Sequence, residues 1–402
     1  MNNRFSISAT RLFYCTLTFI ACWYFYFASS FKIRPFPQLF WIAMAGLSAI
    51  IAFIHKFKFN HIDIAFLGGM AFLLVTSLFS VDTFASMKVV ANYIIYYMIA
   101  RMITKNCDGQ MIHSILLFFS IIHLVCLYMQ VLIPNVYTDY ILPLLPEGIY
   151  ATITEQMEWN AAYYGFSVQT SMSAMYLSIG AVLSAIKAKN SDGTMRKWGY
   201  IALVILFLIA TFFTQRRGSS AASLVVLALI YMQMKGNRGS KIVFAIAIVL
   251  LIAIVGIQNI PGLSGILNKM TSFMATGSIL NGRDVFFKNA VSAIFQKPLF
   301  GWGGGQVQAA IGYAWLENAY LSVLVQWGTI GFIVFYAPYL KILKRTTMDL
   351  RYKKGSCIEF AFYMQILFLI MSTVENYFGE ALNIFIFFVI VLAQDKESVG
   401  NK

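Results

Sequence analysis

The sequence predicts an all-α, polytopic integral membrane protein with about 12 transmembrane helices and a large outer loop that carries short helices. Of its 402 residues, 59% are hydrophobic and 11% are charged, against about 45–50% and about 25% in an ordinary soluble domain. The apolar residues form runs whose lengths are close to the roughly 20 residues that a helix needs to cross a bilayer. These runs fill the chain from 1 to 402, so we expect a single transmembrane domain and no separate soluble one.

The predicted helices follow one another with short connections. The first run is about 20 residues long, longer than the roughly 7–15 residues of a signal-peptide core, so we expect it to be retained. The runs lie at 12–31, 38–55, 62–81, 87–104, 111–133, 161–186, 198–214, 219–234, 242–257, 314–340, 357–374 and 379–393.

The basic residues give the orientation of these helices. A net charge of +14 would suggest nucleic acid as the partner of a soluble protein, but in a multi-span protein Lys and Arg first mark the cytoplasmic loops. Most of them fall in alternate connections if both termini are cytoplasmic, so we expect no nucleic-acid partner. The outer cations are then Lys32, Arg34, Lys88, Arg216, Arg217, Lys269, Arg283, Lys288 and Lys297.

Two of the outer connections are long. The first, 134–160, is acidic, and the second, 258–313, contains four of the nine outer cations and a glycine run. Loops of this length are usually functional or disordered. Apolar residues favour order in the second loop, where they predict a short helix on the membrane surface. They are Val285, Phe286, Val291, Ile294 and Phe295.

The adjacent arginines Arg216 and Arg217 join the helices at 198–214 and 219–234 on the outer side. Arginine is costly in the bilayer and its outer placement opposes the positive-inside bias, which suggests a compensating anion. Guanidinium binds phosphate with paired hydrogen bonds. Adjacent helical positions differ by about 100°, so one arginine alone could reach such a ligand. The alternative is a turn whose arginines reach lipid headgroups.

Other charged and glycine-rich positions in the outer loops extend this hypothesis. Arg283 is a second phosphate-binding candidate, although it could pair with Asp284 instead. The run 301–305 lacks the Lys-Ser/Thr of a nucleotide-binding loop, so we expect a tight turn or flexible backbone beside a ligand. Glu317 is a helix cap or a general base. Its rivals as base are Glu155, Glu158, Glu375 and Glu380.

The sequence offers no pattern for a metal or an organic cofactor. The four histidines lie in the first third of the chain without metal-ligand spacing, and neither a Walker motif nor a Ser-His-Asp pattern is present. We therefore expect no cofactor and no metal, with cations of the protein serving in place of one.

The order of several motifs resembles the bacterial O-antigen polymerase and O-antigen ligase superfamily, over about 212–335. The matching segments are Arg216-Arg217-Gly218-Ser219, Gly282-Arg283-Asp284, Pro298-Leu299-Phe300-Gly301-Trp302-Gly303, Glu317-Asn318-Ala319-Tyr320-Leu321 and Trp327-Gly328-Thr329-Ile330-Gly331. Ligase members typically carry His-Asn where this chain has Glu317-Asn318. That departure favours a polymerase over a ligase.

The resemblance implies a metal-independent membrane glycosyltransferase in the bacterial inner membrane, with an active site that faces the periplasm. Its donor would be an undecaprenyl-diphosphate-linked oligosaccharide, and its partners would be membrane lipids, a chain-length regulator and a flippase. It implies catalytic roles for Arg216, Arg217, Arg283 and Glu317, and substrate binding by Gly301, Trp302, Gly303, Asn318 and Tyr320. The alternatives are transfer of glycan to lipid A-core by a ligase, a lipid-linked oligosaccharide flippase and a structural scaffold.

Overall fold

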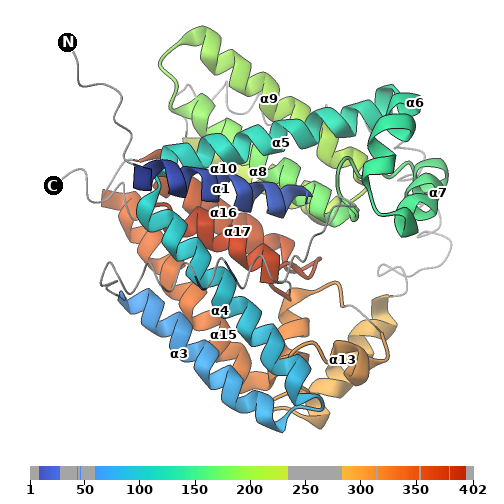
Figure 1. Cartoon of the computed structure of the whole chain (residues 1–402), viewed down its shortest axis with the longest axis vertical. Coiled ribbons are helices and arrows are strands. Elements are labelled where there is room, and N and C mark those ends of the chain that lie inside the picture. The colour runs from blue at the N-terminus through green and yellow to red at the C-terminus, as the bar shows by residue number, and fades with distance from the viewer. Residues whose placement is uncertain are drawn as a thin grey trace. The chain divides into compact units, whose positions relative to one another are not determined.

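The computed structural model describes residues 9–27, 59–233, 283–313, 316–352, 355–379 and 381–394, together with the single positions 43 and 46. Fourteen α-helices and several single turns make up this part of the chain, as the sequence predicts for an all-α protein (Figure 1). The chain divides into two compact units. Unit 1 comprises Met1–Ile20, Pro35–Ile112 and Leu280–Lys402, and unit 2 comprises Ala21–Arg34 and His113–Ile279.

Five of the described helices are long and apolar enough to cross a membrane: His61–Phe79, Gly109–Leu132, Thr170–Lys189, Thr194–Phe213 and Ala319–Tyr352. Each coincides with a run that the sequence predicts as a span. The run at 161–186 becomes helical only at Thr170, because 161–169 is an irregular segment. The runs at 38–55 and 242–257 lie outside the described helices.

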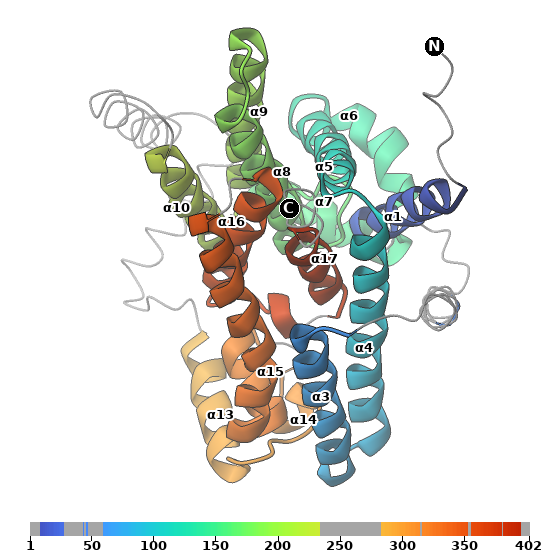
Figure 2. The same cartoon turned by 90° about the vertical axis from the view of Figure 1, so that its left-hand side faces the viewer.

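Unit 1 is built from antiparallel helices of very different lengths. Its principal helices are α3 (His61–Thr76), α4 (Thr83–Asn106), α13 (Arg283–Gln296), α14 (Val307–Ile311), α15 (Ala319–Tyr352), α16 (Ser356–Met371) and α17 (Ala381–Leu392). In both ribbon views α3, α4 and α15 run side by side (Figures 1 and 2). The first part of α1 (Ala9–Phe27) also belongs to this unit, where Thr18 Oγ1 lies 3.0 Å from Cys107 Sγ.

A buried ion pair joins the beginning of α3 to the end of α4. Asn60 caps α3 by accepting from the amides of Ile62 and Asp63. The Asp63 carboxylate in turn lies 2.9 Å from Arg101 Nε and accepts from the Tyr97 hydroxyl at 2.6 Å. Since both charged side chains are at least nine-tenths buried, each depends on the other for compensation of its charge.

Helix α15 is broken at Gly328, where φ is 62° and ψ is −170°. The rings of Tyr320 and Tyr336 have centroids 5.4 Å apart, whereas 16 residues of straight helix would separate them by about 24 Å. The segment before Gly328 therefore folds back along the segment after it. The sequence predicted one continuous span over 314–340, because a glycine within an apolar run does not by itself signal a reversal.

The loop that follows α13 caps both ends of this break. The amides of Trp302 and Gly303 donate to the carbonyls of Val325 and Gln326 at 3.0 and 2.8 Å. In return, the amides of Thr329 and Ile330 donate to the carbonyls of Pro298 and Leu299 at 2.7 and 3.1 Å. A helix end leaves such groups unpaired, so this loop supplies partners that the broken helix lacks.

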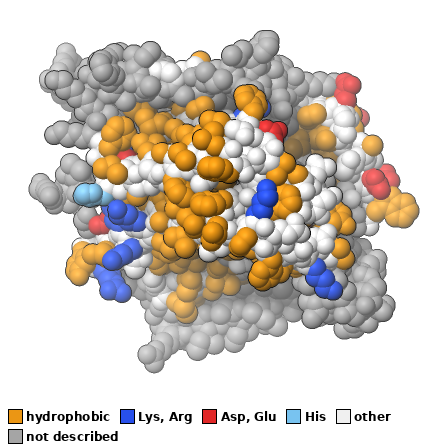
Figure 3. Space-filling view, turned by 90° about the horizontal axis from the view of Figure 1, so that it is seen from below, with side chains coloured by type: hydrophobic (Ala, Val, Ile, Leu, Met, Phe, Trp, Pro, Cys, Tyr) orange, Lys and Arg blue, Asp and Glu red, His pale blue; other side chains and the backbone are white. Residues whose placement is uncertain are grey.

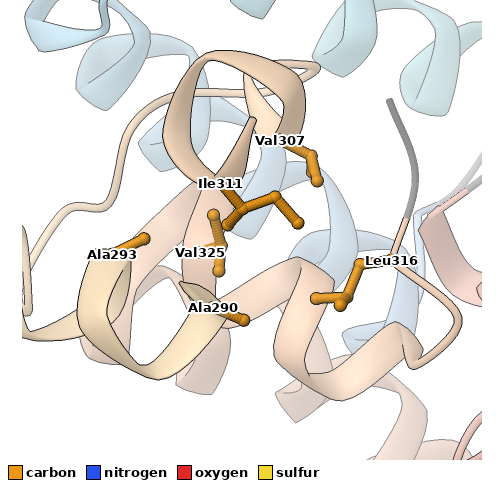
Figure 4. Close-up of a cluster of buried hydrophobic side chains, with 6 residues drawn as sticks. All are labelled: Ala290, Ala293, Val307, Ile311, Leu316 and Val325. Atoms are coloured by element: carbon orange, nitrogen blue, oxygen red, sulfur yellow. The ribbon is translucent and has the colours of Figure 1, made fainter. Parts of the chain in front are cut away.

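A small apolar core holds α13 and α14 against the first part of α15. It contains Ala290, Ala293, Val307, Ile311, Leu316 and Val325, drawn in Figure 4. Phe286 and Ile294 pack against it, whereas Val285, Val291 and Phe295 on the same helix are exposed. The predicted short helix is thus present, and it has one face in a protein core and a second apolar face outside it.

The turn between α3 and α4 and the first turn of α4 expose large apolar side chains in unit 1: Leu78, Phe79, Val81 and Phe84. Leu299 and Phe300 of the capping loop are also exposed. The space-filling view from below shows hydrophobic side chains over much of the described surface, with Lys and Arg in small separate groups (Figure 3). Such a surface is typical of contact with lipid rather than with water.

Unit 2 is centred on helix α8, most of which is buried. Its helices are α5 (Gly109–Leu132), α6 (Pro134–Val136), α7 (Tyr150–Asn160), α8 (Thr170–Lys189), α9 (Thr194–Phe213) and α10 (Arg217–Gln233). Both α9 and α10 pack against α8. A side chain at Gly180 of α8 would overlap the ring of Phe207 on α9, and Ser178 Oγ lies 2.7 Å from Ser223 Oγ on α10.

Candidate functional site

The two adjacent arginines lie at the turn between α9 and α10. Helix α9 ends at Phe213, Arg217 is the first residue of α10, and Arg216 immediately precedes it. The Arg216 side chain is half-buried and that of Arg217 is exposed. The structure thus places the two guanidinium groups in different environments, in keeping with the expectation that adjacent positions face different directions.

The backbone is strained at the residue before the arginines and at a residue that contacts it. Among the described residues, Ala161 and Gln215 are the two non-glycine residues with positive φ, at 45° and 59°. They are neighbours, because Gln215 Nε2 donates to the Ala161 carbonyl at 3.5 Å. A non-glycine residue in this region costs about 1–3 kcal/mol, and such residues concentrate at functional sites. The strain therefore marks the arginine turn independently of its charge.

The segment 161–169, which packs beside the turn, is held by buried hydrogen bonds. Gln130 Oε1 on α5 accepts from the amides of Tyr164 and Gly165, each at 2.8 Å. The Gly165 carbonyl accepts from the Tyr137 hydroxyl at 2.9 Å, and the Tyr163 amide donates to the Phe213 carbonyl at 3.0 Å. This segment is therefore fixed to α5 and to the end of α9.

Arg216 is fixed to the end of that same segment. Its Nε donates to Thr170 Oγ1, the first residue of α8, at 2.7 Å. Burial raises the pKa of the nearby Tyr164 phenol, and the positive charge of Arg216 acts in the opposite direction. Nothing in the local sequence marks Thr170 or Gln130 as part of the site, because Thr and Gln are ordinary residues in apolar runs.

Small residues after the arginines allow close helix packing. Ser219, Ser220, Ala222 and Ser223 are all buried on α10. This face of α10 lies against α8. The Ser220 amide donates to the Arg216 carbonyl at 3.0 Å, so α10 begins directly at the arginines.

In unit 1, the predicted glycine run forms a tight turn. A side chain at Gly301 would lie 2.5 Å from the Gln326 carbonyl group. The Gly305 amide donates to Gln326 Oε1 at 2.7 Å, and the Gly304 amide donates to Ser86 Oγ at 2.8 Å. Trp302, which follows Gly301, is half-buried, and Lys297 Nζ lies 4.7 Å from the centroid of its ring.

The other predicted residues of unit 1 lie at two helix starts. Arg283 begins α13. Asn318 Oδ1 accepts from the Leu321 amide at 2.9 Å and so caps α15, while its Nδ2 donates to the Thr373 carbonyl. Glu317, beside it, is half-buried. The Tyr320 hydroxyl donates to the Leu369 carbonyl at 2.8 Å.

The contact between Asn318 and Thr373 joins the residue after Glu317 to the turn that contains Glu375. Glu375 is 8% exposed. Two of the carboxylates considered as general bases therefore come from adjoining turns of unit 1. Of the other rivals, Glu155 and Glu158 lie on α7 in unit 2, and Glu380 lies outside the described residues.

The described residues contain no group of three or more His, Cys, Asp or Glu side chains that could hold a metal ion. The candidate residues instead offer guanidinium groups, a half-buried carboxylate and partly buried aromatic rings. The guanidinium groups suit binding of a phosphorylated ligand.

Residues 202–336 match the family model described as O-Antigen ligase. The match begins within α9 and ends in α15, so it includes the arginine turn, Arg283, the glycine turn and Glu317. No curated protein matches the chain. Residues 202–336 therefore form a domain similar to that of the O-antigen ligase and polymerase family.

Proposed function

We propose that this protein is an O-antigen polymerase, which joins undecaprenyl-diphosphate-linked repeat units by glycosyl transfer on the periplasmic side of the bacterial inner membrane. The observation that carries the proposal is the arginine turn at 216–217. Its first arginine is fixed by Thr170, its backbone is strained at Gln215, and it lies inside the family domain. Strain and fixed orientation at a cationic turn favour a preorganised anion site over casual contacts with lipid headgroups.

The proposed reaction is a single displacement. A hydroxyl oxygen of the acceptor sugar attacks the anomeric carbon of the donor and forms the new glycosidic bond. The bond between that carbon and the diphosphate oxygen breaks, and its electron pair leaves with undecaprenyl diphosphate. The acceptor proton goes to a carboxylate, for which Glu317 is our first candidate and Glu375 our second.

The cations stabilise the leaving group in this scheme. Negative charge grows on the diphosphate as the bond breaks, and preorganised donors there contribute about 2.7–4 kcal/mol each where measured in other enzymes. Arg216 and Arg217 are the proposed donors, and Arg283 is a further proposed donor on the strength of the sequence. Trp302 and Tyr320 are proposed to contact sugar rings, beside the backbone of Gly301 and Gly303 and the side chain of Asn318.

Two observations distinguish the proposal from its rivals. Glu317 occupies the position where ligases of the resembling superfamily carry histidine, which favours a polymerase over a lipid A-core ligase. A flippase should line its central path with charge, whereas the buried ion pair of the described residues, Asp63 with Arg101, lies at the beginning of α3 and the end of α4. Such a position suits a structural role.

The test is a gel of lipopolysaccharide and lipid-linked glycan from cells that lack this protein. The cells are complemented with the wild type, with Arg217→Ala or with the control Arg196→Ala, which removes an exposed arginine at the start of α9. We expect cells without the protein to keep one repeat unit on the core and lose the ladder. The wild type and the control should restore the ladder, and Arg217→Ala should not.

Two other outcomes would contradict the proposal. Polymer that accumulates on the lipid carrier and never reaches the core would identify a ligase. An unchanged ladder in cells without the protein would favour a transporter or a scaffold. Quantification of the membrane-inserted protein separates loss of activity from loss of folding.

A further inference from the structure

We infer that Thr170 is a positioning residue that sets the orientation of the Arg216 guanidinium for the diphosphate. This inference rests on the proposed function and deepens it. The central contact is the hydrogen bond of 2.7 Å from Arg216 Nε to Thr170 Oγ1, in which the acceptor residue is 6% exposed.

The hydrogen bond from Arg216 Nε to Thr170 restricts the orientation of the guanidinium group. A guanidinium is planar and presents its five donors in a rigid fork. Once Nε is held by one acceptor, rotation about the end of the side chain is restricted and the plane of the terminal nitrogens is set. A bidentate contact with phosphate depends on that plane, so the Thr170 hydroxyl fixes the direction in which Arg216 can bind an anion.

Thr170 is itself held in place from two sides. It begins α8, which is buried against α9 and α10. It also follows the segment 161–169, which Gln130 and Tyr137 fix to the rest of unit 2. Ser173, one turn further along α8, donates to the Tyr164 carbonyl. A hydroxyl at this position is therefore preorganised and can impose its geometry on the longer arginine side chain.

The structural alternative is that Thr170 only begins α8. The N-cap residue of this helix is Gln169, which makes no side-chain capping bond, and the Ser173 amide donates to the Gln169 carbonyl at 3.2 Å. Since the backbone makes this bond, the Thr170 hydroxyl is not needed for it. The two roles can therefore be separated by removing the hydroxyl alone.

The experiment uses full-length protein in lipid nanodiscs and two substitutions at one position. Thr170→Val keeps the shape of the side chain and removes the hydroxyl, whereas Thr170→Ser keeps the hydroxyl. The readouts are binding of undecaprenyl diphosphate and the kcat and KM for polymerisation of the lipid-linked repeat unit. A hydrogen bond to a charged group is worth roughly ten- to hundredfold, so we expect Thr170→Val to lower kcat/KM by about that factor and Thr170→Ser to recover most of the loss.

A double-mutant cycle with Arg216→Ala then shows whether Thr170 acts through this arginine. We expect Thr170→Val to have no further effect on kcat/KM in the Arg216→Ala background. Equal loss in both backgrounds would overturn the inference, because Thr170 would then act through α8. So would wild-type kinetics of Thr170→Val alongside a large loss in Arg216→Ala, a result that leaves the proposed function intact. Full activity of Arg216→Ala would overturn both the inference and the proposed role of this arginine.

Discussion

Substitution of Gly328 by alanine should destabilise unit 1 strongly, because Gly328 is the point at which α15 reverses. Its φ of 62° and ψ of −170° lie in a region that is nearly exclusive to glycine, and occupancy by another residue costs about 1–3 kcal/mol. A Cβ there would also lie 2.4 Å from the Leu299 carbonyl carbon and 2.5 Å from its oxygen. Overpacking of this kind costs about 1–3 kcal/mol.

Relief of that overlap requires the capping loop to move at Leu299, which weakens its contacts with α15. Movement of Leu299 lengthens the hydrogen bonds that its carbonyl and that of Pro298 accept from the second half of α15, and each bond contributes about 0.5–1.5 kcal/mol. Together these effects lower the free energy of unfolding of Gly328→Ala by about 3–9 kcal/mol.

The assay is unfolding of the purified protein in mixed detergent micelles, followed by tryptophan fluorescence. Gly312→Ala is the matched control, because Gly312 also has positive φ, at 80°, but a Cβ there meets nothing within 4 Å. In Gly312→Ala the free energy of unfolding should fall only by the cost of a left-handed backbone conformation, about 1–2 kcal/mol. If the two variants unfold at the same denaturant concentration, the reversal at Gly328 and its capping loop do not hold this part of the fold together.

Two further substitutions test buried polar contacts in the two units. Asp63→Asn leaves Arg101 buried without its partner charge and should cost about 3–5 kcal/mol of unfolding free energy. Asp349→Asn, which removes the partly exposed pair with Arg345, should cost at most about 1 kcal/mol; equal losses in the same titration would contradict the buried ion pair. Gln130→Leu leaves two buried amides without their acceptor and should lower the free energy of unfolding by about 1–3 kcal/mol for each amide. It should also reduce the polysaccharide ladder, because the segment before Thr170 loosens. Unaltered stability would show that Gln130 does not hold that segment.

Helix positions along the chain could be predicted from the sequence because apolar runs and charged connections are local signals. The runs at 62–81, 111–133 and 198–214 correspond to α3, α5 and α9 within a few residues. The reversal of α15 could not be predicted, because it depends on pairing between the loop 298–303 and the segment 325–330. Neither segment reveals its partner in its own composition.

In the candidate site, too, some residues could be predicted from their local sequence and others depend on contacts with distant parts of the chain. Arg216 and Arg217 could be singled out because arginines in a connection predicted to be outer oppose the usual distribution of charge. Thr170 and Gln130 are 46 and 86 positions earlier in the chain than Arg216, and their residue types are common in apolar helices. They could be recognised only from the hydrogen bonds that the fold creates.

Preorganisation is the physical feature that unites the arginine turn with its surroundings. Strain at Ala161 and Gln215 is maintained by the bonds of the segment 161–169. Under the proposed function, a site built in this way would stabilise developing charge without reorganising during the reaction.

The most direct test of the central claim is the turnover of purified protein in nanodiscs with an undecaprenyl-diphosphate-linked repeat unit as the substrate. The measurement is the rate at which longer lipid-linked glycan and undecaprenyl diphosphate appear together. We predict that Arg217→Ala and Arg216→Ala each lower kcat by roughly 10²- to 10³-fold, as for loss of a preorganised donor, while Arg196→Ala keeps the wild-type rate. Wild-type kcat in both Arg216→Ala and Arg217→Ala would contradict the claim that this turn stabilises the leaving diphosphate.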